Sequence, residues 1–143
     1  MMQMVFNCVL IGILIQSYFV YAKRPDFVTD DMVAMVADDK ARCMGEHGTT
    51  EGYMIDQVNE GNIPNDPKIT CYMYCLFESF SVMDEDGVLE ADMLTGFFPE
   101  EIQAKGASVL SDCGTQDGAD NCEKVYKIAT CVQSKVPEMW FML

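Results

Sequence analysis

Basic residues are scarce in this sequence. Nine Lys and Arg stand against 23 Asp and Glu in 143 residues, which gives a net charge of −14 and a pI near 4.1. A polyanion repels nucleic acid and anionic lipid surfaces, so neither is an expected partner. Half of the residues are apolar, which excludes a solvating acidic tail and favours one folded domain.

Histidine is scarcer still, because His47 is the only one. The local sequence supports neither a Ser-His-Asp nor a Cys-His arrangement, and it contains no glycine-rich phosphate loop. The acidic stretch Asp84 to Gly87 does not fit a calcium loop, since Val82 and Met93 would fall at the first and twelfth positions, where Asp and Glu are required. We therefore expect no enzyme activity, no cofactor and no metal site.

Charged residues are absent from residues 1–22. Val9 to Ile15 form a short apolar core, and Val20-Tyr21-Ala22 places small residues at the −3 and −1 positions of a cleavage site. These features predict a secretory signal peptide over 1–22, although a basic first region is missing. The alternative is a membrane anchor, but Gln16 and Ser17 interrupt a stretch that is short for a bilayer span. We expect an extracellular domain over 23–143, with no stable membrane insertion.

Seven cysteines are many for a chain of this size. Cys8 would leave with the signal peptide, and the other six follow the pattern C-x27-C-x3-C-x37-C-x8-C-x8-C. An even number in a secreted chain predicts three disulfides, for which spacing alone allows 15 connectivities. Cys71 and Cys75 share one helix face, so they bond different elements, whereas Cys122 and Cys131 face opposite sides of one helix. Zinc is disfavoured, because structural zinc sites prefer closer cysteine pairs, often with histidine.

The pattern of apolar residues after residue 22 predicts six helices and no strands. Thr29 is a capping residue, and Asp66-Pro67 is a cap followed by proline at the first helical position. Met73, Leu76 and Phe80 recur at three- and four-residue steps and mark one buried face. The expected helices run from Asp30 to Met44, from Thr50-Glu51 to Asn59-Glu60-Gly61, from Pro67 to Met83, from Leu89 to Phe97, from Pro99 to Cys113, and from Asp120 to Ser134.

The end of the sequence is apolar, which is unusual for a chain terminus. Residues 138–143 include the only Trp, and an apolar end must be buried in a soluble protein. The segment either closes the core or forms the wall or lid of a ligand cavity, and the sequence leaves both open. Twelve methionines, of which three lie in 1–22, leave nine flexible apolar side chains that suit an adaptable cavity as well as an ordinary core.

The cysteine pattern and two runs of sequence resemble the insect odorant-binding proteins of the pheromone-binding and general odorant-binding type. The runs are Ile69-Thr70-Cys71-Tyr72-Met73-Tyr74-Cys75-Leu76 and Asn121-Cys122-Glu123-Lys124-Val125-Tyr126. The stretches around Cys43 and His47 are similar to antennal pheromone-binding members from honeybees. The resemblance covers the whole predicted mature chain and implies an all-α, six-helix fold around an internal apolar cavity, with the C-terminal tail lining it.

The resemblance also implies the disulfide pairing and the ligand-binding residues. The pairs are Cys43–Cys75, Cys71–Cys122 and Cys113–Cys131. Leu76 and Phe80 are added from the apolar face of the third expected helix. The expected ligand-binding residues are Leu76, Phe80, Leu94, Phe98, Ile102, Val109, Leu110, Val132, Trp140, Phe141 and Met142.

The implied function is that of a secreted carrier, which binds small hydrophobic volatiles, odorants or pheromones, and transports them through sensillar lymph. An olfactory receptor is the implied macromolecular partner, and the carrier would be a monomer or a pH-dependent homodimer. The alternative is a secreted helical interaction or structural protein of venom, cuticle or reproductive fluid that uses the same scaffold without a volatile ligand.

Overall fold

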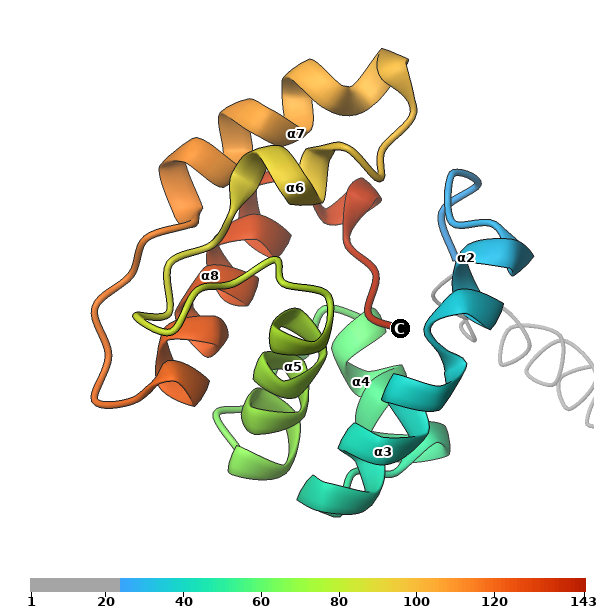
Figure 1. Cartoon of the computed structure of the whole chain (residues 1–143), viewed down its shortest axis with the longest axis vertical. Helices are drawn as coiled ribbons and strands as arrows, with labels where there is room; N and C mark the ends of the chain where they lie inside the picture. Colours follow the sequence, from blue (N-terminus) through green and yellow to red (C-terminus); the bar gives the residue numbers. More distant parts are fainter. Residues whose placement is uncertain (1–23) are drawn as a thin grey trace, which may run out of the picture.

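A computed structural model describes residues 24–143, so the predicted signal peptide and Cys8 lie outside the described residues. In this part of the chain α5 packs against α3 and α8, and α7 packs against α6 and α8 (Figure 1). An isolated antiparallel bridge between Met83 and Leu89 is its only β pairing. The α-helices are α2 Asp30–Met35, α3 Ala37–His47, α4 Asp56–Asn59, α5 Pro67–Ser79, α6 Ala91–Thr95, α7 Glu100–Cys113 and α8 Asn121–Lys135, joined by the π-helical turn η2 Glu51–Ile55 and the 3₁₀ turn η3 Pro137–Met139.

Side-chain caps begin three of these helices. The Thr29 side chain accepts a hydrogen bond from the Met32 amide, and the Asp66 side chain accepts one from the Lys68 amide ahead of α5. At the start of α8, Asp120 accepts from the Glu123 amide while the Glu123 carboxylate accepts from the Ala119 amide. These contacts satisfy amides that have no partner inside the helix, so the predicted starts at Thr29 and Asp66 are confirmed.

The first expected helix is interrupted at Val36. Its φ of −97° and ψ of 0° fall between α2 and α3, so the single helix predicted over 30–44 was wrong. The Val36 side chain is buried while Met35 beside it is 72% exposed. A local departure from helix geometry changes the face that each following residue presents, so α3 begins in a different register from α2.

The third expected helix ends at Ser79, four residues before its predicted end. Ser81 has a positive φ of 53°, and the chain then reverses so that Val82 accepts a hydrogen bond from the Glu90 amide. The Leu89 amide donates to Gly114, which delays the start of α6 to Ala91. Residues 84–87 make the predicted acidic turn, closed by the Gly87 amide on the Asp84 carbonyl at 3.0 Å.

Three disulfides tie the helices together in the expected pairing. Cys43–Cys75 joins α3 to α5, Cys71–Cys122 joins α5 to α8, and Cys113–Cys131 joins α7 to α8. Each cross-link restricts the unfolded chain and contributes about 2–4 kcal/mol when unstrained. The central helix α5 is therefore fixed on two sides.

The core forms where α5 meets its neighbours. Ile69, Tyr72, Met73 and Leu76 of α5 are buried against one cluster that also holds Val125, Ile128 and Ala129 of α8. The predicted buried face of this helix is confirmed for Met73 and Leu76, whereas Phe80 beyond its end is half-buried. Within residues 24–143, no helix has both the length and the apolar character that a membrane span requires.

Candidate functional site

The C-terminal segment, residues 140–143, lies against α4 and α5 (Figure 1). The Trp140 indole Nε1 donates to the Val58 carbonyl at 2.7 Å. The Tyr72 hydroxyl donates to the main-chain oxygen of Leu143 at 2.6 Å. Met142 is only 6% exposed and belongs to the core cluster. The apolar end of the chain is thus packed into the fold, as its composition predicts.

One side chain holds the main chain of this segment in register. Asn59 at the end of α4 donates from Nδ2 to the Met142 carbonyl at 3.1 Å and accepts at Oδ1 from the Met142 amide at 2.6 Å. The pair copies the hydrogen bonding of a neighbouring strand, because an amide side chain offers both a donor and an acceptor. The main-chain amide and carbonyl of the buried Met142 are therefore both satisfied.

The phenol that reaches Leu143 is itself buried. Burial disfavours the charged phenolate, and the negative charge of Glu51 acts in the same direction, so the pKa of Tyr72 is raised well above its ordinary value of 10.0. Tyr72 therefore stays protonated over the whole physiological range and keeps its hydrogen-bond donor.

A surface ion pair links the turn before the segment to α7. Glu138 in η3 pairs with Lys105, and the hydrogen bond from this lysine holds the pKa of the Glu138 carboxyl below its ordinary value of 4.5. Both side chains are more than half exposed, so the pair contributes little to stability. Because the lowered pKa keeps Glu138 ionised, the pair persists into mildly acidic solution.

A hollow of about 540 Å³ lies beside the C-terminal segment. One wall comes from α2 and α3, a second from η2 and α4, and Phe141, Met142 and Leu143 form the third. Val33, Val36 and Ile55 add apolar surface to it. Its volume falls within the range of roughly 300–1,000 Å³ that is usual for small-molecule pockets.

Charged side chains of both signs also border this hollow. The cations are Arg24 and Lys40, and the carboxylates are Glu51, Asp56 and Glu60. Arg24 pairs with Asp30 at 2.5 Å, and Lys40 pairs with Glu51 across the hollow's edge. The lining thus combines apolar side chains with these charged groups, which we call the rim, and suits a molecule with an apolar body and a polar head.

The structure places most of the predicted ligand-binding residues in one apolar region. Leu76, Leu110 and Met142 belong to the core cluster, and Phe80, Leu94, Phe98, Val132 and Trp140 pack against it. Ile102, Val109 and Phe141 are half-buried. Of the eleven, Phe141 and Met142 also line the hollow beside the C-terminal segment, and Met142 thereby connects the hollow to the apolar region.

Sequence reasoning missed the N-terminal half of this hollow. Val33 and Val36 lie in the first expected helix, but nothing in their spacing separates a core contact from a pocket wall. Asn59 carries no motif that would single it out, since its partner Met142 lies 83 residues away in the sequence. Only the folded chain brings these groups together.

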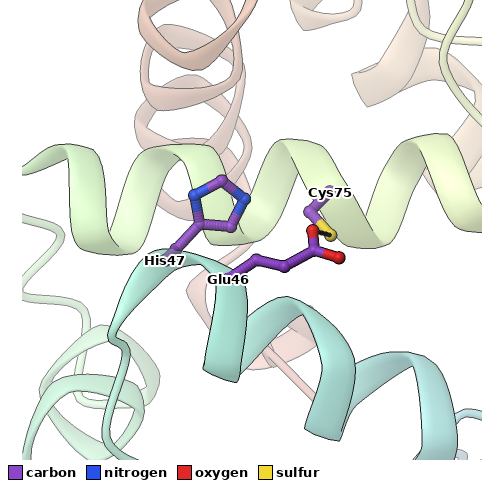
Figure 2. Close-up of side chains that lie close together, drawn as sticks. All are labelled: Glu46, His47 and Cys75. Carbon is purple, nitrogen blue, oxygen red and sulfur yellow. Dashed lines mark hydrogen bonds between the residues drawn. The ribbon is translucent and has the colours of Figure 1, made fainter.

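A cluster of Glu46, His47 and Cys75 brings three possible metal-ligand atoms within 4.8 Å of one another (Figure 2). Cys75 is bonded to Cys43, and a disulfide sulfur is not the thiolate that binds metals. The Glu46 carboxylate is held by Arg42 at 3.1 and 3.2 Å. These three residues therefore do not fit a metal ion while the disulfide is intact.

Similar proteins place this arrangement in a family. Residues 26–135 match the PBP/GOBP family model. The chain is 29% identical to General odorant-binding protein 69a of Drosophila melanogaster over 104 residues, which are 73% of this chain and 70% of that protein.

Solved structures agree with the sequence relatives. The medfly odorant-binding protein CcapOBP22/CcapOBP69a is 27% identical, with a TM-score of 0.63 and coverage of 72% of this chain and 89% of that one. Apis mellifera odorant binding protein 5 shares the fold at 20% identity, with a TM-score of 0.69 and coverage of 80% and 96%. The all-α fold, the three disulfides and the family model together show that this chain belongs to the PBP/GOBP family of insect odorant-binding proteins.

Proposed function

We propose that this chain is a secreted carrier of small hydrophobic volatiles, odorants or pheromones, which it binds beside the C-terminal segment. The observation that carries the proposal is the hollow of about 540 Å³ walled by Phe141 and Met142, in a chain of an odorant-binding family. The fixed hydrogen bonds of Asn59 with Met142 keep this wall in place.

The ligand of this carrier contacts the apolar side chains on both sides of the hollow. Val33, Val36 and Ile55 face it from the helices, and Phe141 and Met142 face it from the C-terminal segment. Leu76, Leu110 and Val132 belong to the apolar region that Met142 joins to the hollow. A volatile of about 12 heavy atoms at roughly 0.7 kcal/mol per atom reaches micromolar affinity.

The carrier acts outside the cell, after a signal peptide over residues 1–22 has been removed. Three disulfides support this compartment, because such bonds persist in oxidising surroundings. In this proposal the protein crosses sensillar lymph and delivers its ligand to an olfactory receptor, as a monomer or a pH-dependent homodimer. The domain over 23–143 contains the whole site.

The test is displacement of the fluorescent probe N-phenyl-1-naphthylamine by a panel of volatile alcohols, esters and fatty acids. The protein is expressed as the full chain in a secretory host, recovered oxidised, and checked for three disulfides by mass. Saturable micromolar binding that weakens when residues 140–143 are removed supports the carrier. Failure of oxidised protein to take up any probe would favour the interaction or structural protein instead.

A further inference from the structure

We propose that the hollow beside the C-terminal segment selects ligands with an apolar body and a cationic head, such as protonated alkylamines, over carboxylates of equal length. The inference rests on the proposed function, because it names the ligand class of that same site. It comes from the balance of paired and unpaired charges around the rim.

The cations of the rim are already neutralised. Arg24 donates to the Asp30 carboxylate at 2.5 Å, and Lys40 pairs with Glu51 while its side chain is only 17% exposed. A ligand carboxylate would have to break one of these pairs to gain a partner. The exchange replaces one ion pair with another and leaves a carboxylate of the protein without its cation.

The remaining carboxylates of the rim have no such partner. Asp56 at the start of α4 and Glu60 just after its end lie one helical turn apart, and both border the hollow. Neither side chain has a hydrogen-bond or ion-pair partner within residues 24–143. Like charges four residues apart repel, so a cation placed between them relieves this repulsion.

Two further features of the rim favour the same head group. Tyr53 in η2 borders the hollow, and an aromatic ring attracts a cation that lies over its face. The net charge of −14 adds a negative potential that attracts cations and repels anions. The apolar lining residues Val33, Val36 and Phe141 receive the alkyl chain.

The test compares three eight-carbon ligands that differ only in the head group. The measurement is the displacement of N-phenyl-1-naphthylamine by octylamine, 1-octanol or octanoate at pH 7. The protein is the oxidised one that a secretory host produces from the full chain. We expect octylamine to bind about three- to tenfold more tightly than octanol, since the two carboxylates are exposed, and octanoate to bind most weakly. In the double variant Asp56→Asn, Glu60→Gln the amine preference, which is the ratio of the octylamine affinity to the octanol affinity, falls towards one.

The control is the double variant Asp92→Asn, Glu78→Gln, which removes the same charge from exposed positions that do not line the hollow. Retention of the amine preference in this control supports the role of Asp56 and Glu60 in selecting the head group. Equal loss of the preference in both variants would assign it to net charge and overturn the proposal. Tighter binding of octanoate than of octylamine would overturn the head-group selection but leave the carrier function in place. Displacement by none of the three ligands would overturn both.

Discussion

Replacing Asn59 by alanine tests whether the C-terminal segment is fixed as the structure shows. The variant loses two hydrogen bonds, of 3.1 and 2.6 Å, that join the side chain to both polar groups of Met142. Each hydrogen bond contributes about 1 kcal/mol, so Asn59→Ala should lower the free energy of unfolding by about 2 kcal/mol. For a domain of this size that corresponds to a loss of about 8 °C in Tm.

Fluorescence of the sole tryptophan reports both on the C-terminal segment and on unfolding of the whole domain. Trp140 lies in the segment itself, so its emission reports both urea unfolding and loosening of the segment before unfolding. In Asn59→Ala the emission maximum should move to the red in the absence of urea. Asn62→Ala is the matched control, because Asn62 is exposed and its side chain has no hydrogen bond within the described residues. A stability loss within about 0.5 kcal/mol of this control would refute the reasoning.

Four other predictions concern Tyr72, Glu138 and the Cys113–Cys131 bridge. In a spectrophotometric titration, Tyr72 should resist ionisation near pH 10, so that the native protein gains less absorbance there than the urea-unfolded protein; Tyr72→Phe abolishes the difference. Because the folded pKa of Tyr72 is raised, its contribution to stability is complete below pH 10 and is lost at higher pH. Urea titrations at pH 8 and pH 11 should show this loss of stability in the wild type but not in Tyr72→Phe. The folded pKa of Glu138 is lowered, so its pair with Lys105 contributes above pH 4.5 and is lost only below that value; Glu138→Gln should therefore leave unchanged any difference in probe affinity between pH 7 and pH 5. Removing the Cys113–Cys131 bridge, which spans 18 residues, should cost about 3 kcal/mol of unfolding free energy, measured by urea titration of the double alanine variant.

Local signals predicted much of the fold. Thr29 and Asp66 are capping residues whose partners lie two or three residues away, so the sequence contains the whole interaction. The resemblance to odorant-binding proteins added the disulfide pairing, which spacing alone left among 15 connectivities. Family knowledge thus supplied what local chemistry could not.

Tertiary contacts account for the parts that were not predicted. The interruption at Val36 is marked by no proline or glycine in the sequence, so no local signal predicts it. The end of α5 at Ser79 depends on the pairing of Val82 with Glu90, which is a contact between separate stretches. Such effects override helix propensity, and they cannot be predicted from the identities of neighbouring residues in the sequence.

Two of the eleven expected ligand-binding residues, Phe141 and Met142, line the hollow, and the other nine do not. The apolar composition of the chain end left open whether these two residues close the core or form a wall. The opposite wall could not be predicted, because Val33, Val36 and Ile55 have the same apolar character as ordinary core residues. The position of α2 and α3 relative to the segment decides their role.

The most direct test of the central claim is an NMR titration of methionine methyl groups in the oxidised protein with 1-octanol. Met142 lines the hollow, whereas Met93 on α6 is 48% exposed and does not line it. If the ligand binds against the C-terminal segment, the Met142 methyl resonance shifts saturably at micromolar concentration and the Met93 resonance stays in place. A titration that saturates without moving Met142 would contradict the account.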